Sequence, residues 1–224
     1  MGGIFLLRRE SPSFLMEREK METEKKENVV LRVSKEYWGE LLKAMNERVK
    51  SLRENFLCLL NLYNCEVGAE VGVLEGEHAI QIIEYLPNLK KLYLVDSWKA
   101  YSADEYPDFA ATNQEGNDNR YQQVIQKFST DTRIIIIRKE SVQASLDINE
   151  PLDFVYIDAN HRYEFVASDI LVWYQKVKSG GLVCGHDYDK PEVARAVDDF
   201  CSAMGIINHS WGAPLNLSWF FVKK

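Results

Sequence analysis

The sequence lacks several features that would each place it in a broad class of protein. Its four cysteines form no Cys-x-x-Cys pair, which favours a reduced, intracellular protein over a secreted disulfide scaffold. No apolar run is long enough to span a membrane, and the opening MGGIFLLRRE has its charges in the wrong order for a signal peptide. Acidic residues outnumber basic ones, giving a net charge of −7, so no general nucleic-acid surface is expected. We therefore expect a cytoplasmic protein with neither nucleic acid nor membrane as a partner.

The chain does contain enough apolar residues for one sizeable domain, because 46% of its 224 residues are hydrophobic. Residues 1–28 are rich in Glu, Lys and Arg and are predicted to form a disordered leader. Residues 29–64 are predicted to form a helical cap, since apolar residues recur at helical spacing after Ser34. This cap covers the sheet, forms a dimer face or acts as a lid, and a homodimer is expected. Residues 65–224 form the main domain.

Strand-like and helical segments alternate through the main domain. Buried strands are predicted at 67–73, 91–96, 133–138, 152–158 and 181–185, and helices at 77–86, 117–128, 141–146, 163–178 and 191–204. This alternation is typical of a doubly wound α/β fold with a mostly parallel sheet and helices on both faces. Two closely spaced strands at 206–211 and 217–222 are expected to add an antiparallel edge, which makes the sheet seven-stranded.

The first strand leads into a turn with two glycines, in the stretch VGAEVGVLEG that ends at Gly76. Gly72 and Gly76 let the backbone approach a ligand closely, because no Cβ intervenes. The helix that follows contributes free N–H groups and a partial positive charge. The turn lacks the GxGxxG spacing of a dinucleotide site and carries Glu70 and Glu75 instead. These acidic residues disfavour a pyrophosphate and favour a cationic ligand.

Polar or acidic side chains also follow the other strands, at the edge of an open α/β sheet where ligands bind. Asp96 ends the second strand about twenty positions after the glycine turn, the offset at which a carboxylate holds a ribose diol. The later strands are followed by Glu140 and Ser141, by Asp158 and His161, and by His186 and Asp187. The acidic glycine turn favours a cation, and Asp96 is placed to hold a ribose. Together they indicate a sulfonium nucleoside that carries an amino acid.

Four stretches carry a resemblance to a known family: VGAEVGVLEGEHA, LYLVDSW, PLDFVYIDANHRYEFVASDI and SGGLVCGHDY. Together they resemble class I S-adenosylmethionine-dependent methyltransferases, and most of all the small-molecule O-methyltransferases of the macrocin O-methyltransferase type. The resemblance covers residues 65–224. Its most specific part is the YIDxxHxYE stretch, followed at the right distance by GGxxxGHDY.

The resemblance implies that the strand-end residues bind the methyl donor, S-adenosylmethionine. The residues expected to line its methionine part are Glu70, Gly72 and Gly76. Those expected at the ribose are Asp96, with Ser97 and Trp98 flanking. Those expected beside the adenine are Glu140 and Ser141, and Asp158 completes the cofactor-binding set.

The resemblance also implies a divalent cation, usually magnesium, that binds acceptor oxygens. Asp158 and Asp187 would hold it, with His186 next to them. Some relatives have two acidic residues where this chain has His186 and Asp187. Histidine is a poorer magnesium ligand, although it suits manganese, iron or zinc. The site is therefore weaker, differently metallated or metal-free, and His186 is alternatively a hydrogen-bonding partner at the strand end.

The chemistry is coherent from the residues alone. Two aspartates at adjacent strand ends supply the oxygen ligands that a hard cation needs. A hydroxyl group bound to that cation loses its proton more readily. Histidine titrates near neutral pH, and related metal-dependent catechol methyltransferases have a lysine base at the offset of His161. His161 is therefore the candidate general base and, together with Asp158, the predicted catalytic residue.

The predicted function is metal-assisted O-methylation of a small hydroxylated acceptor such as a sugar, a phenol or a natural product. One alternative is a nicotinamide-dependent oxidoreductase, against which the missing GxGxxG counts. Another is a non-catalytic module of the same fold, with the charged leader recruiting partners. The long segment from Trp98 to Gly116 is expected to shape the acceptor pocket, but its composition names no acceptor.

Overall fold

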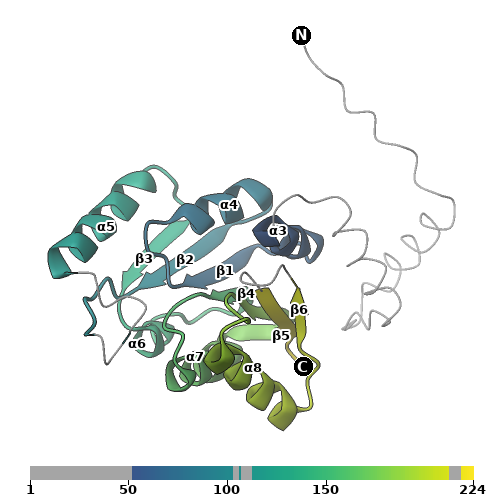
Figure 1. The fold of residues 1–224 in the computed structure, drawn as a ribbon. Coiled ribbons are helices and arrows are strands. Elements are labelled where there is room, and N and C mark those ends of the chain that lie inside the picture. The colour runs from purple at the N-terminus through teal and green to yellow at the C-terminus, as the bar shows by residue number, and fades with distance from the viewer. Residues whose placement is uncertain (1–51, 103–105, 107–112, 212–217) are drawn as a thin grey trace, which may run out of the picture. The chain divides into compact units, whose positions relative to one another are not determined.

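The computed structural model describes residues 52–102, 106, 113–211 and 218–224 (Figure 1). The predicted leader, and the part of the predicted cap before Leu52, lie outside the described residues. The rest of the cap contains α3 (Leu52–Leu62), whose side chains at Leu57, Leu59 and Leu60 are fully buried. The described part of the cap therefore packs into the core of the main domain.

The sheet has seven strands in the order β3-β2-β1-β4-β5-β7-β6. Its first five strands are parallel: β1 (Val67–Val71), β2 (Lys91–Asp96), β3 (Ile134–Arg138), β4 (Leu152–Ile157) and β5 (Val177–Gly185). β7 (Ser218–Val222) runs antiparallel to both β5 and β6 (His209–Trp211). The predicted doubly wound α/β fold with an antiparallel C-terminal edge is confirmed.

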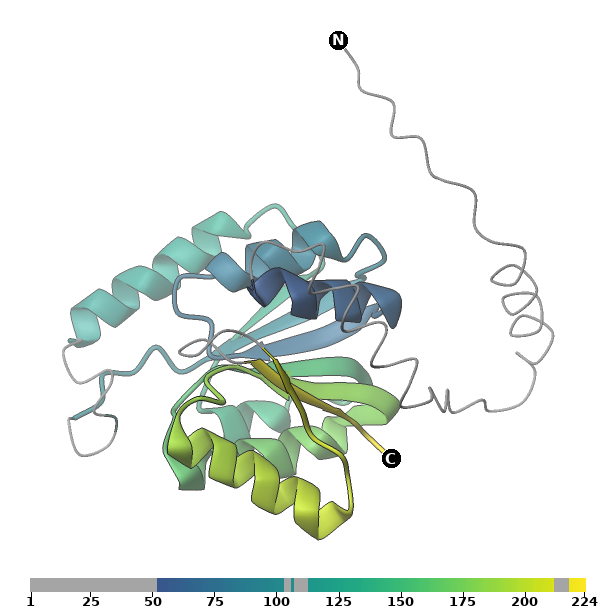
Figure 2. The ribbon, with the colours of Figure 1, turned by 45° about the vertical axis from the view of Figure 1, so that its right-hand side comes forward.

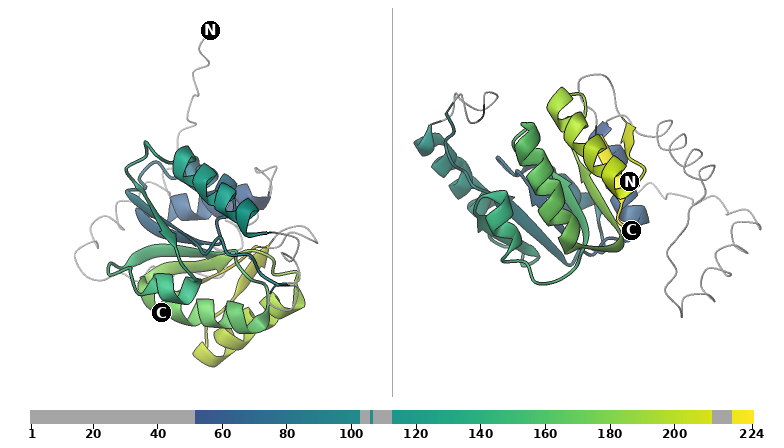
Figure 3. Two further views of the ribbon diagram at one scale, coloured as in Figure 1. Left: turned by 90° about the vertical axis from the view of Figure 1, so that its left-hand side faces the viewer. Right: turned by 90° about the horizontal axis from the view of Figure 1, so that it is seen from below.

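Helices cover both faces of the sheet. α3, α4 (Glu77–Tyr85) and α5 (Gln114–Lys127) lie on one face (Figures 1 and 2). α6 (Ser141–Ser145), α7 (Tyr163–Lys176) and α8 (Pro191–Met204) lie on the other, and Figure 3 shows these three side by side from below. Each face of the sheet thus has its own helical layer and its own apolar core.

The two cores follow from the alternation of side chains along each strand. In β4, Phe154 and Tyr156 pack with α3, α4 and α5, whereas Val155 and Ile157 pack with α7 and α8. All four are nearly or fully buried. A strand buried on both faces reads as a continuous apolar run, which is why LDFVYI was recognisable in the sequence.

The boundary between α7 and β5 differs from the predicted one. The helix ends at Lys176 instead of continuing to Lys178, and the strand begins at Val177 instead of Gly181. Val177 has extended backbone and pairs with Leu152, after which the register between β4 and β5 shifts. The polar residues inside this irregularity carry no strand pattern, so the sequence placed the start of the strand too late.

The strand order also determines where a ligand can bind. β1 and β4 are neighbours in the sheet although β2 and β3 come between them in the chain, so the direction of winding reverses there. Ligands of open α/β sheets bind beyond the carboxyl ends of the strands at such a switch point. Two backbone hydrogen bonds join the strand ends: Gly72 N–H donates to the Val95 carbonyl at 2.8 Å, and Asp158 N–H donates to that of Val71 at 2.7 Å.

Two expectations from composition concern the whole chain. Among the described residues, no helix is both long and apolar enough to cross a membrane. All four cysteines lie in the described part and are free thiols. The cytoplasmic location and the homodimer stay predictions.

Candidate functional site

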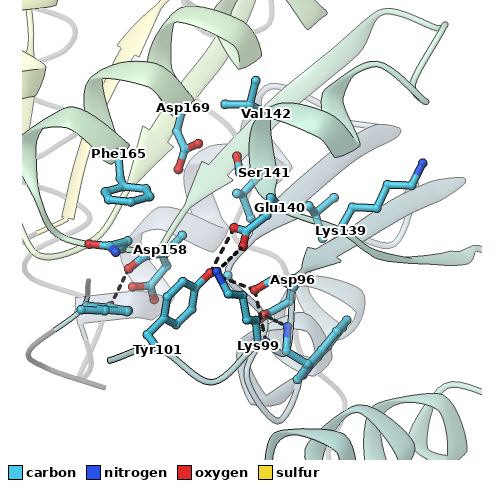
Figure 4. Close-up of a pocket in the computed structure, with 18 of the residues that line it drawn as sticks. Asp96, Lys99, Tyr101, Lys139, Glu140, Ser141, Val142, Asp158, Phe165 and Asp169 are labelled. Atoms are coloured by element: carbon cyan, nitrogen blue, oxygen red, sulfur yellow. Dashed lines mark hydrogen bonds and ion pairs between the residues drawn. The ribbon is translucent and has the colours of Figure 1, made fainter. Parts of the chain in front are cut away.

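A cavity of about 460 Å³ lies at the carboxyl ends of the central strands, at the switch point. Its wall brings together most of the predicted cofactor residues, from loops far apart in the chain: Gly72, Asp96, Ser97, Trp98, Glu140, Ser141 and Asp158. Figure 4 shows Asp96, Glu140 and Asp158 around this space. Glu70 and Gly76 were also predicted to contact the cofactor, but they do not line the cavity.

Gly72 follows β1 directly and has a backbone conformation that glycine adopts readily, at φ +92°. A Cβ at this position would overlap the carbonyl group of Asp158. The absence of a side chain therefore lets the ends of β1 and β4 approach each other. Gly76 is the N-cap of α4 at φ +80°, where a Cβ would lie 2.8 Å from the Phe128 ring. This second glycine is needed for the start of the helix and its packing.

Glu70 points away from the cavity, toward α4. Its carboxylate is 2% exposed and lies 2.9 Å from Nδ1 of His78 on that helix. The His78 ring in turn lies against Tyr156, with 4.2 Å between the ring centroids. Side chains alternate along β1, so Val71 lines the cavity while Glu70 faces the opposite core. The methionine contact expected for Glu70 thus stays a prediction without support from the cavity wall.

Asp96 holds the glycine turn and the following loop in place. Its Oδ2 accepts hydrogen bonds from the backbone N–H groups of Val73 at 2.9 Å and Leu74 at 3.0 Å. Its Oδ1 accepts one from Trp98 N–H at 2.8 Å. An ionised carboxylate has about four acceptor positions, so these bonds leave one for a ligand. The same carboxylate therefore shapes the cavity and retains capacity to bind in it.

The segment after β2 is tied to the end of β3 across the cavity. The hydroxyl group of Tyr101 lies 2.9 Å from Ser97 Oγ and donates to Glu140 Oε2 at 3.1 Å (Figure 4). Burial raises the pKa of Tyr101 to about 12, although its hydrogen bond with Ser97 opposes the shift, so the phenol keeps its proton. Residues 103–105 and 107–112 of the predicted acceptor segment, including Phe109, lie outside the described residues.

A cluster of aspartate and histidine side chains adjoins the cavity at Asp158. Ligand atoms of Asp158, His161 and Asp187 all lie within 4.8 Å of one another. His186, which was predicted as a ligand, lies beside this group, with Nδ1 3.3 Å from Asp187 Oδ2 and 4.0 Å from Asp158 Oδ1. Burial alone would raise the pKa of Asp187, but hydrogen bonds with the two imidazoles outweigh burial and hold this pKa well below its usual range.

His161 has partners at both ring nitrogens. Nδ1 lies 2.8 Å from Lys190 Nζ, and Nε2 lies 2.9 Å from Asp187 Oδ2. An ammonium group only donates and a carboxylate only accepts, so Nδ1 is the acceptor and Nε2 carries the proton. Tyr106 also approaches His161 Nδ1 at 3.3 Å and donates to the Ala159 carbonyl at 2.7 Å. To act as a base, His161 must exchange the hydrogen bond from Lys190 for one from the acceptor.

Asp158 belongs to two cavities at once. It lines the large cavity, and it also lines a crevice of about 10 Å³ together with His161 and His186. The cavity lined by the predicted cofactor residues and the Asp–His cluster are therefore adjacent and share one carboxylate.

The cavity also contains residues that the sequence did not single out, on α7 in particular. Phe165 and Asp169 line it, and Asp169 is 4% exposed. A signal for Asp169 was present in the sequence. It stands at a core-facing position of the helix, three residues after Val166 and followed by Ile170 and Trp173, where the apolar period calls for another apolar residue.

A doubly wound sheet with carboxylates at successive strand ends, around a cavity large enough for a nucleoside, defines a class of enzymes that bind a nucleotide-like cofactor. Residues 69–188 match the family model described as "Methyltransferase domain". The match spans more than half of the 224 residues, and the chain therefore belongs to this methyltransferase family. Membership favours a methyltransferase over the oxidoreductase alternative.

Solved structures with the same fold include several methyltransferases. A Staphylococcus aureus protein assigned as a caffeoyl-CoA O-methyltransferase is 12% identical with a TM-score of 0.58, over 94% of this chain and 98% of that one. SMU.1697c from Streptococcus mutans, assigned as a methyltransferase and solved with SAH, is 11% identical with a TM-score of 0.60, over 79% and 99%. The O-methyltransferase NovP is 16% identical with a TM-score of 0.57, over 77% and 79%. At these identities the likeness establishes the fold alone. No functionally curated protein matches the sequence significantly.

Proposed function

We propose that this protein transfers the methyl group of S-adenosylmethionine to a hydroxyl oxygen of a small molecule, assisted by a divalent cation. The observation that carries the proposal is the position of Asp158, which lines the large cavity and is also a member of the Asp–His cluster. A methyl donor in the cavity and an acceptor at the cluster would meet at this residue. The family supports methyl transfer, and the Asp–His cluster that adjoins the cavity at Asp158 supports a cation next to the donor.

The large cavity supports the donor half of the proposal. The free acceptor position of Asp96 suits a ribose hydroxyl group, with Ser97 and Trp98 flanking it. Glu140 and Ser141 lie where the base would be held. Gly72 lets the ligand approach the backbone, while the cofactor contacts expected of Glu70 and Gly76 stay predictions. The Asp158 carboxylate also favours the sulfonium cation of S-adenosylmethionine. S-adenosylhomocysteine (SAH), the ligand of the Streptococcus mutans protein, has a neutral thioether in its place.

The cluster supports the acceptor half, and its donor set fits a divalent cation. Two carboxylates and an imidazole converge within 4.8 Å, and the carboxylates supply the oxygen ligands that magnesium or manganese needs. Asp158 and Asp187 would hold the cation, and His186 would orient Asp187. When bound, the cation makes an acceptor hydroxyl group more acidic.

The remaining chemistry belongs to side chains of this chain. His161 Nδ1 takes the hydroxyl proton once it exchanges its bond with Lys190, while Asp187 holds Nε2–H and fixes the tautomer. The acceptor oxygen attacks the methyl carbon as the carbon–sulfur bond breaks, which yields a methyl ether and S-adenosylhomocysteine. The protein contributes mainly by positioning the two reactants in line. Sugars, phenols and hydroxylated natural products are the proposed acceptors.

Binding of the donor tests the function directly. Isothermal titration calorimetry of the folded full chain is expected to show a single site per chain. S-adenosylmethionine and S-adenosylhomocysteine should both bind this site and compete for it. Folded protein that binds neither would refute the proposed function. NADH serves as the comparison ligand, and no heat or fluorescence change is expected with it.

The metal assignment predicts a difference between the aspartates and His161. Asp158→Asn and Asp187→Asn are each expected to weaken Mn²⁺ binding by about 10- to 100-fold, because each removes an anionic ligand. His161→Gln is expected to leave Mn²⁺ affinity within about threefold while it abolishes transfer, since a base is lost and not a ligand. Electron paramagnetic resonance of free Mn²⁺ measures the affinities. A loss in His161→Gln as large as in the aspartate variants would assign His161 to the metal and remove it as the base.

A further inference from the structure

One wall of the large cavity is formed by α7 and contains a buried acid. Asp169 is 4% exposed and lines the cavity. Its neighbours on the same face of the helix, Val166, Ile170 and Trp173, are buried and apolar. Placing a carboxyl group among apolar side chains is costly unless hydrogen bonds compensate. This group therefore needs partners inside the protein or in the cavity.

Inside the protein the partner is the hydroxyl group of Ser141, and the direction of that hydrogen bond is fixed. Trp173 Nε1, which can only donate, donates to Ser141 Oγ at 2.8 Å. The Ser141 hydroxyl proton is then available to Asp169, whose carboxylate accepts it. The remaining acceptor capacity of Asp169 is directed to the cavity that it lines.

The walls next to Asp169 are apolar and partly uncovered. Phe165 is 37% exposed and Val142 is 43% exposed, and both line the cavity. Figure 4 shows them on either side of Asp169, with Ser141 facing its carboxyl group. Apolar side chains beside a buried hydrogen-bonding group suit a flat ring that is recognised along one edge. Because the carboxylate of Asp169 is a hydrogen-bond acceptor, that edge of the ring must carry a hydrogen-bond donor, such as an amino group.

We propose that Asp169 recognises the exocyclic amino group of a heterocycle bound in this part of the cavity, and thereby selects a 6-aminopurine over a 6-oxopurine. The inference rests on the proposed function, under which the heterocycle is the base of the methyl donor. It assigns the choice of base to a helix residue that acts with Ser141 and Trp173, and not to the strand ends alone.

The charge of Asp169 agrees with this role. Burial and the negative charge of Glu140 raise the pKa of Asp169 to about 7, although the hydrogen bond from Ser141 opposes the shift. An amino group of a ligand donates to the ionised form and stabilises it. A 6-oxopurine places a carbonyl oxygen there instead, so that two acceptors face each other when Asp169 is ionised, and the preference for the 6-aminopurine should be largest above pH 7.

The substitution Asp169→Asn makes the test sharp, because the Ser141–Trp173 pair fixes how an amide would sit. The Ser141 proton still needs an acceptor, so the amide oxygen turns toward Ser141 and the NH₂ group faces the cavity. The variant keeps the volume of the side chain but offers a donor where the natural protein offers an acceptor. Its preference between the two purines should therefore fall or reverse.

The experiment compares S-adenosylhomocysteine with S-inosylhomocysteine by calorimetry on the full chain. The natural protein is expected to bind the adenosine compound about 10- to 100-fold more tightly, the range of one hydrogen bond to a charged group. In Asp169→Asn this ratio is expected to drop at least about tenfold. Glu84→Gln is the control, since it removes one negative charge at an exposed position of α4 that does not line the cavity, and its ratio should equal that of the natural protein.

The remaining outcomes distinguish a failure of the role proposed for Asp169 from a failure of the proposed function. Equal binding of the two compounds by the natural protein would overturn the role of Asp169 without any variant, and would leave the proposed function standing. An unchanged ratio in a folded Asp169→Asn, with both affinities reduced alike, would show that Asp169 only braces α6 against α7. Binding of neither compound by the natural protein would refute the proposed function and the inference with it.

Discussion

Gly72→Ala is expected to cost the domain more than about 4 kcal/mol of unfolding free energy, which is exceptional for one methyl group. Two effects add at this position. The backbone has φ +92°, where a Cβ is strained, and the new Cβ would overlap the carbonyl group of Asp158 on the neighbouring strand. Backbone cannot move aside as a flexible side chain can. The ends of β1 and β4 would have to separate, so binding of S-adenosylhomocysteine should be lost as well.

Gly180→Ala provides a matched control for this prediction. Gly180 has φ +78°, but a Cβ there would meet nothing within 4 Å. Its substitution therefore carries the strain without the overlap and should cost about 1–2 kcal/mol, with cofactor affinity unchanged. Urea denaturation measures both variants, and calorimetry measures binding. Equal destabilisation of the two variants would show that the contact between the strand ends contributes nothing.

Asp96→Ala is expected to lower the affinity for S-adenosylhomocysteine at least about 100-fold, because hydrogen bonds to a carboxylate are worth about 1.5–3 kcal/mol each. The loss has two parts. The ribose would lose its acceptor, and the N–H groups of Val73, Leu74 and Trp98 would lose theirs. Unpaired N–H groups should also reduce the unfolding free energy by about 3 kcal/mol. Calorimetry and urea denaturation measure the two effects separately.

The control for Asp96 is Glu84→Gln, which removes one negative charge from an exposed position on α4. Neither affinity nor stability should change in it. The affinity and stability of Asp96→Asn are expected to fall between those of Asp96→Ala and Glu84→Gln. Its amide oxygen still accepts hydrogen bonds, but its NH₂ group faces other donors. A folded Asp96→Ala that binds S-adenosylhomocysteine as tightly as the natural protein would remove Asp96 from the ribose site.

The fold could be predicted from sequence because each strand carries its own pattern. β2, β4 and the last part of β5 are apolar runs that end in Asp96, before Asp158 and before His186, and polar strand ends in a parallel sheet must meet at one edge. This geometry alone brings Asp96 and Asp158 to the same cavity. Local pattern and topology agree here, so little tertiary information was needed.

The parts that could not be predicted depend on packing. Alternation along β1 shows that Glu70 and Val71 face opposite ways, but not which face meets the cavity. The contact between His161 and Lys190 joins residues 29 positions apart through a loop, and no spacing rule anticipates it. Asp169 contributes to the cavity only because α7 is rotated to bring Phe165 and Asp169 under the strand ends.

The shared position of Asp158 has a thermodynamic consequence. A ligand that moves or polarises this carboxylate from the side of the large cavity alters the free energy of whatever binds it from the crevice. Such coupling is reciprocal, so the factor by which the methyl donor changes the affinity for the cation equals the factor by which the cation changes that for the donor. S-adenosylmethionine is cationic at sulfur and S-adenosylhomocysteine is not, so repulsion by a bound cation acts on the donor more than on the product. Under the proposed function, one carboxylate between two sites would therefore make the affinity of each site depend on whether the other is occupied.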